Sequence, residues 1–157
     1  MKTKENGNTK LLKKLNELLA AYQIAYFNIR SSHWMINGEN FFELHKVVAV
    51  AYNDETEKID AIAERILTLG GVPLLTASEM FKTSSIKEKA GSGNQEKCVT
   101  GMLHDLKELA VLENEIAKIA DEQDDIVTTD QMTKYLGEQQ KTSWMLSHGL
   151  NKRSSIK

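Results

Sequence analysis

The sequence is poor in the residues that form turns and cross-links. One proline and nine glycines in 157 residues are too few for a turn-rich all-β fold. The single cysteine, Cys98, excludes an internal disulfide and a zinc site built from several thiolates. No run approaches the roughly 18 consecutive apolar residues of a membrane span. These absences favour a single helical domain, which we expect to be cytoplasmic.

Four long segments have the apolar spacing of amphipathic helices, at about residues 11–36, 40–69, 94–120 and 128–150. A shorter helix is expected between the second and third of them, from Thr76 to about Glu88. Polar residues at capping-box spacing mark three helix starts, and these pairs are Asn40 with Glu43, Thr76 with Glu79, and Thr128 with Gln131.

The predicted fold is all-α. It is a four-helix bundle over residues 9–151 with a long crossover between helices 2 and 3, and the short extra helix lies in that crossover. We expect residues 1–8 to form a flexible basic tail and residues 152–157 to form a short basic tail. Di-iron centres inside such a bundle use Glu-x-x-His on two helices, and none of the four histidines has a glutamate three residues before it.

A different metal site is compatible with the spacing. His33 lies near the end of the first helix and His45 near the start of the second, so a tight turn places the two imidazoles at the same height. Asp60 and Glu64 are four residues apart and share a helix face. Fifteen residues separate His45 from Asp60, about 22 Å along a straight helix. The two pairs therefore cannot meet within one chain.

Two copies of the second helix can bring them together. Asp60 lies only about 60° around the helix from His45. If the copies cross antiparallel near residues 52–54, His45 of one chain approaches Asp60 and Glu64 of the other, and twofold symmetry builds two equal sites. Such ligands suit Fe(II), and also zinc, manganese or cobalt. The plainer alternatives are a capping or packing role for the histidines and a solvated face for the acids.

Two segments, residues 33–45 and 60–73, resemble the Dps-like mini-ferritins of the ferritin-like superfamily. Residues 33–45, HWMINGENFFELH, are similar to the family pattern His-Trp…Gly…Phe-Phe-x-Leu-His. Residues 60–73, DAIAERILTLGGVP, resemble its Asp-x-x-Ala-Glu-Arg…Leu-Gly-Gly-x-Pro segment, and Trp144-Met145-Leu146 also fits. The resemblance covers nearly the whole chain after residue 10.

The resemblance implies that the bundle is ferritin-like and that 12 subunits form a shell with a ferroxidase centre at each twofold interface. Its ligands correspond to His33 and His45 of one subunit and Asp60 and Glu64 of its neighbour. It further implies oxidation of Fe(II), preferentially by hydrogen peroxide, mineralisation of Fe(III) inside the shell, and protection from oxidative damage. Many members carry an acidic residue one turn after the second histidine. This chain has Ala49 there, which predicts a weak second iron position.

Other residues carry secondary expectations. Trp34, beside His33, is a candidate electron donor, with interface packing as the alternative. Three acidic residues near the start of the last helix, which are Asp121, Asp125 and Asp130, are candidates for lining a pore that attracts Fe(II). They are otherwise a solvated loop.

DNA binding is the alternative function, in which tails and shell rather than metal chemistry act. Lys2, Lys4 and Lys10 are its candidate residues, since repeated basic tails contact phosphates by counterion release. A nucleoid association would follow. The formal net charge of -2 and the lack of a base-reading motif disfavour this alternative.

Overall fold

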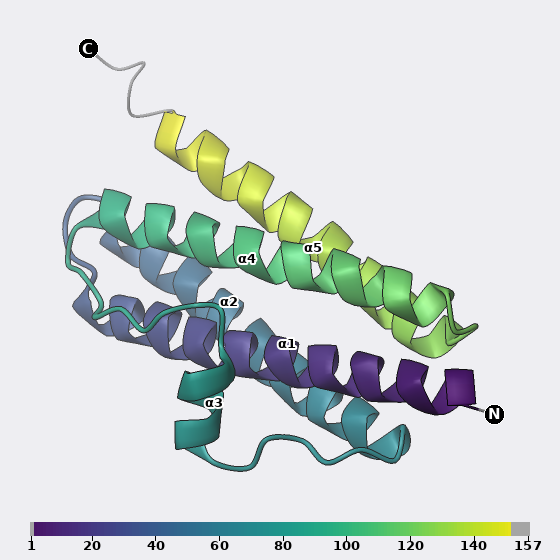
Figure 1. Ribbon diagram of the computed structural model, residues 1–157. Coiled ribbons are helices and arrows are strands. Elements are labelled where there is room, and N and C mark those ends of the chain that lie inside the picture. Colours follow the sequence, from purple (N-terminus) through teal and green to yellow (C-terminus); the bar gives the residue numbers. More distant parts are fainter. Residues whose placement is uncertain (1, 152–157) are drawn as a thin grey trace.

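The computed structural model describes the backbone of residues 2–151 and the side chains of residues 8–149. Within this part the chain forms five helices (Figure 1), which are α1 (Lys2–Met35), α2 (Phe41–Thr68), α3 (Ala77–Thr83), α4 (Gln95–Asp121) and α5 (Ile126–Asn151). The all-α prediction is confirmed, and so is the short helix between the second and third long ones.

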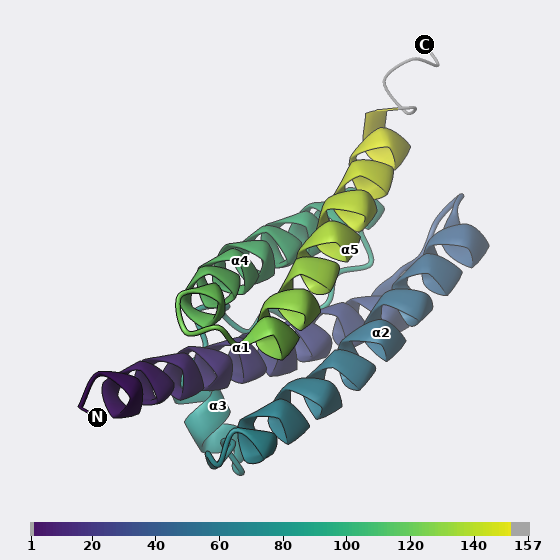
Figure 2. The ribbon, with the colours of Figure 1, turned by 90° about the vertical axis from the view of Figure 1, so that its right-hand side faces the viewer.

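The long helices pack as two hairpins joined through α1 and α4. α1 lies along α2, α4 lies along α5, and α1 also packs against α4, as both views show (Figures 1 and 2). The short α3 rests against α1 in the crossover. The main core includes six residues that are at most 1% exposed, which are Leu15, Leu18, Ile62, Ile66, Leu109 and Ile116.

Glycines allow the tight turns at both ends of α2. Gly38 has φ +104° between α1 and α2, and Gly70 has φ +80° just after α2. These are left-handed conformations that other residues adopt at a cost. The first turn reverses the chain within five residues and so sets the relative height of the end of α1 and the start of α2.

Two of the three predicted capping boxes are wrong, and one is confirmed. At Thr76 both hydrogen bonds of the box with Glu79 are present. At Asn40 the side chain makes no cap hydrogen bond. Its backbone has φ -100° and ψ 27°, rather than the extended conformation that directs a capping side chain toward the first-turn amides.

The last helix is capped by a different residue from the one predicted. α5 begins at Ile126, and the carboxylate of Asp125 accepts hydrogen bonds from both the backbone N–H and the hydroxyl of Thr128. Asp125 also pairs with Arg65 of α2 at 2.7 Å. Thr128 is thus the donor to the cap rather than the cap itself. Gln131 instead donates to the Tyr135 hydroxyl.

The short helix ends earlier than Glu88. α3 stops at Thr83 because the next residue, Ser84, is extended and its hydroxyl bonds both the N–H and the C=O of Ile86. This turn places Ile86, 1% exposed, in the core.

The predicted tails are described only in part. α1 begins at Lys2, whereas the side chains of Lys2 and Lys4 and all of residues 152–157 lie outside the described residues. The flexible tails therefore stay a prediction. Among the described residues, no helix combines the length and apolarity needed to cross a membrane.

The Arg65–Asp125 contact gives a pH-dependent prediction. Burial disfavours the Asp125 carboxylate, but its hydrogen bonds from Thr128 and its pairing with Arg65 outweigh this and lower its pKa. Asp125→Ala should lower the free energy of unfolding by about 1–2 kcal/mol, measured by urea denaturation. Because the folded pKa is lowered, the difference is fully present above pH 3.8, the ordinary value, and shrinks as the pH falls through the folded pKa. An equal urea midpoint in both proteins at neutral pH would contradict the assignment.

Candidate metal centre

The tight turn brings the two predicted histidines together. His33 is in the last turn of α1, and His45 is about one turn into α2. Their rings stack with centroids 3.7 Å apart and planes 26° from parallel. The ring of Phe41 packs against the ring of His45, with the two ring centroids 4.9 Å apart. The imidazole pair is therefore held in place by neighbouring rings before any ion binds.

The hydrogen bonding of His33 prepares it as a ligand. Its Nδ1 lies 3.1 Å from the backbone carbonyl oxygen of His45, and since a carbonyl only accepts, Nδ1 carries the proton. The lone pair is then on Nε2, where a metal ion can bind. Burial, followed by the nearby His45, lowers the pKa of His33. Both effects favour the neutral imidazole that metal binding requires.

Tyr52 completes this end of the site, although its sequence position did not predict a role there. Its ring meets that of His33 edge-on at 5.2 Å. Tyr52 is seven residues after His45, two helical turns, so its face could be read from the sequence. Its contact with the first helix depends on packing.

The two predicted carboxylates are far from the histidines. Asp60 and Glu64 are exposed near the other end of α2. Among the described side chains, no three His, Cys, Asp or Glu gather as a metal-binding group. One chain therefore presents a pair of imidazoles at one end of α2 and a pair of carboxylates toward the other.

A second polar cluster, which was not predicted from the sequence, lies in the middle of the bundle. The Tyr22 hydroxyl donates to Glu113 Oε1 at 2.5 Å, and Gln139 donates to both groups. Close by, the buried Lys58 ammonium bonds Asp54 and Glu138. Burial raises the pKa of Glu113. The cluster draws on all four long helices.

The remaining candidates are spread over the surface. Trp34 is 67% exposed, with the Arg30 guanidinium 5.2 Å from its ring centroid. Asp121 and Asp130 are exposed, whereas Asp125 is engaged by Arg65 and Thr128. Lys10 is exposed on the first turns of the described part of α1.

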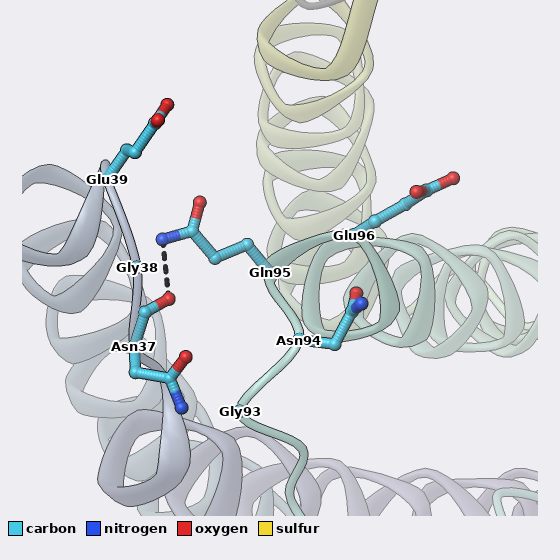
Figure 3. Close-up of a pocket in the computed structure, with 7 residues that line it drawn as sticks. All are labelled: Asn37, Gly38, Glu39, Gly93, Asn94, Gln95 and Glu96. Carbon is cyan, nitrogen blue, oxygen red and sulfur yellow. Dashed lines mark hydrogen bonds between the residues drawn. The ribbon is translucent and has the colours of Figure 1, made fainter.

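A hollow lies beside the α1–α2 turn but does not form a metal site. It is lined by residues 37–39 and 93–96, and Gln95 crosses it to donate to the Asn37 carbonyl at 2.8 Å (Figure 3). Glu39 and Glu96 lie on opposite sides of it and do not converge (Figure 3). The histidine pair thus remains the better candidate.

Comparison with known proteins agrees with this architecture. A ferritin-like domain matches residues 12–156, so the helices define a ferritin-like bundle. The Dps protein of Vibrio cholerae O1, described as a member of a broad superfamily of ferritin-like diiron-carboxylate proteins, is 39% identical with a TM-score of 0.90, over 92% of this chain and 91% of that one. The Dps protein of Bacillus brevis is 30% identical with a TM-score of 0.89, over 92% and 97%.

A curated relative gives the same result. The DNA protection during starvation protein of Porphyromonas gingivalis is 39% identical over 144 residues, which are 92% of this chain and 91% of the relative. The chain therefore belongs to the Dps family of the ferritin-like superfamily. The family resemblance predicted from residues 33–45 and 60–73 is confirmed.

The stacked pair yields a prediction for the metal-free protein. His45→Gln removes the imidazole that opposes protonation of His33 and opens its surroundings. The pKa of His33 should rise toward the ordinary value of 6.5 in the variant, as followed by NMR titration of its ring signals with a chelator present. A pKa for His33 that is unchanged, or lower still, in His45→Gln would show that the stacking does not set it.

Proposed function

We propose that this protein is a ferroxidase and iron-storage shell. Each of its metal centres takes His33 and His45 from one subunit and Asp60 and Glu64 from its neighbour. The observation that supports this most is the division of ligands along α2. A preformed imidazole pair lies at one end, and an exposed carboxylate pair lies too far away to join it. Such a division is useful only if a second copy supplies the missing half.

The exposed face of α2 fits such a neighbour. Phe42 and Leu67 are 85% and 57% exposed, and both lie within about 60° of His45 around the helix. Phe42 is near the histidine end and Leu67 near the carboxylate end. When two copies of α2 cross antiparallel at residues 52–54, each Phe42 comes close to the other chain's Leu67. The same crossing that covers the two apolar side chains joins the two halves of the site.

The ligand set suits iron as substrate. Neutral imidazole nitrogen and carboxylate oxygen bind Fe(II), and the carboxylates favour the harder Fe(III) product. Zinc, manganese and cobalt can replace Fe(II) at such a site. With hydrogen peroxide as oxidant, two Fe(II) supply the two electrons that reduce one peroxide to water. In the proposal Fe(III) then moves into a shell of 12 subunits and mineralises, which protects the cell from oxidative damage.

The entry of Fe(II) into the shell and the donation of an electron by Trp34 are part of the same proposal. Asp121 and Asp130 are free to face an aqueous pore and attract Fe(II), whereas Asp125 is held by Arg65 and contributes less. Trp34 remains a candidate electron donor beside His33. Its exposed ring equally suits packing at an interface.

DNA binding is the second candidate, and the names of relatives favour it. The Porphyromonas gingivalis relative is named for DNA protection during starvation. Lys10 is exposed. In a shell of 12 subunits each subunit would contribute Lys10, together with Lys2 and Lys4, to DNA binding. Binding of this kind weakens steeply with salt. A shift in the gel mobility of DNA that is present at low salt and is lost when residues 1–10 are deleted would support DNA binding.

Oxidation kinetics test the ferroxidase proposal. Anaerobically loaded Fe(II) should be oxidised by peroxide faster than in a protein-free control and faster than by air, and the iron should stay soluble. Asp60→Ala should slow this step at least about tenfold, the lower end of what disturbing even the groups that orient metal ligands costs. Stopped-flow absorbance of Fe(III) gives the rates.

The matched control is Glu96→Gln, an exposed acid on α4 that is not among the four proposed ligands, and it should oxidise iron at the wild-type rate. Wild-type rates no faster than the protein-free control would contradict the proposal.

Mixed assemblies test the sharing of ligands between subunits. His45→Ala and Asp60→Ala subunits, each strongly slowed alone, should regain activity when equal amounts are refolded together. A mixed pair has one centre with every ligand, so about a quarter of all centres are restored. The control is a mixture of His33→Ala and His45→Ala, which lose ligands from the same half and should regain nothing. Equal activity in the two mixtures would refute the shared site.

A further inference from the structure

All four tyrosines of the sequence lie on one route that begins at the candidate metal centre. Tyr52 meets His33 edge-on at 5.2 Å, and Tyr26 meets Tyr52 edge-on at 6.2 Å. Tyr22 is four residues from Tyr26 and so lies one turn away on the same side of α1. Tyr135 in turn packs against Tyr22 at 6.4 Å. The route leads from the surface of the bundle to its middle.

We propose that Tyr52, Tyr26 and Tyr22 form an electron relay, which gives the second electron to peroxide when the centre holds a single Fe(II). The relay ends at Tyr22, whose hydroxyl proton passes to Glu113 as its electron leaves. The inference rests on the proposed function and names further residues for the same centre.

The need for such a donor follows from the ligand set. Peroxide requires two electrons to become two water molecules, and one Fe(II) supplies one. Two imidazoles and two carboxylates form one four-ligand position. The side chain of Ala49, one turn after His45, has no atom that could help to bind a second ion. A centre with one iron therefore needs another source of electrons if hydroxyl radical is not to be released.

The charges around each tyrosine determine which tyrosine holds the radical. The Arg30 guanidinium donates to the Tyr26 hydroxyl at 2.6 Å and lies 4.7 Å from its ring centroid, so a positive charge makes oxidised Tyr26 unfavourable. The Lys58 ammonium lies 5.1 Å from the ring of Tyr135 and has the same effect there. Tyr26 is thus oxidised only transiently during the transfer, and the radical does not remain on Tyr135.

Tyr22 has the opposite environment. It is fully buried and donates its proton to Glu113 Oε1 at 2.5 Å. The Glu113 carboxylate can take that proton during oxidation, and the raised pKa that burial gives Glu113 makes it a better acceptor. Its second oxygen, Oε2, is buried with no hydrogen-bond partner among the described residues. A neutral tyrosyl radical beside a protonated Glu113 leaves no new charge in the core.

The electrons and protons of the relay balance with Fe(II) and hydrogen peroxide, which are the reactants of the proposed function. Fe(II) becomes Fe(III) and loses one electron. Tyr22, through Tyr26 and Tyr52, loses the other, and its proton joins the Glu113 carboxylate. The two electrons with two protons from solvent break the O–O bond of hydrogen peroxide and give two molecules of water. A later Fe(II) at the centre returns an electron along the same route and restores Tyr22, which takes its proton back from Glu113.

The experiment uses assembled wild-type protein loaded anaerobically with one Fe(II) per subunit and mixed with peroxide. Freeze-quenched samples are measured by electron paramagnetic resonance for a tyrosyl radical, while absorbance follows Fe(III) in parallel. The expected result is a tyrosyl signal in wild type that is lost in Tyr22→Phe and in Tyr52→Phe. Tyr135→Phe is the matched control, since it removes a hydroxyl at the end of the same route, and it should keep the signal.

The outcomes separate the relay from the proposed function. Fe(III) formation without a tyrosyl signal in wild type, or an undiminished signal in Tyr22→Phe, overturns the relay and leaves the ferroxidase intact. No Fe(III) formation above the protein-free rate overturns both. Because Tyr22→Phe disturbs a buried network, wild-type protein grown on ring-deuterated tyrosine provides a second measurement without any substitution. Its signal should narrow, and a signal that keeps its width would place the radical on another residue and refute the relay.

Discussion

A straight helix separates its own metal-binding groups, and the functional account depends on that constraint. His45 and Asp60 share the exposed side of α2 but stand about 22 Å apart along it. No side-chain movement closes such a gap. The imidazole half is already assembled by the Gly38 turn and by the stacking of His33 on His45. A second subunit is therefore part of the proposed centre, rather than only a means of enclosing a cavity.

The interior of the bundle is used differently. In the middle of the four helices, a place where related bundles can hold metal, this chain has Lys58 paired with Asp54 and Glu138. The ammonium group supplies the positive charge that these acids require. The neighbouring Tyr22–Glu113 pair is closed by Gln139. The polar middle thus satisfies most of its own groups and leaves the proposed binding of iron to the exposed face of α2.

The sequence was sufficient for features that depend on local spacing. Apolar periodicity predicted the four long helices, and the Gly38 turn predicted the meeting of His33 with His45. Caps were less predictable, because their geometry depends on the backbone conformation at one residue. Asn40 has a suitable side chain in an unsuitable conformation. Asp125, which looked like a pore acid, caps α5 and pairs with Arg65 from a distant segment. The Tyr22–Glu113 contact joins residues 91 positions apart, and no local pattern reveals such a pairing.

The central claim is that one centre contains ligands from two chains, and the most direct test is crystallographic. Crystals of the assembled protein soaked in Co(II) would be measured at the cobalt absorption edge, where anomalous scattering locates the ion. The account predicts a peak between His33 and His45 of one subunit and Asp60 and Glu64 of its neighbour. A peak inside the bundle among Tyr22, Glu113 and Gln139, or no peak at the subunit interface, would contradict it.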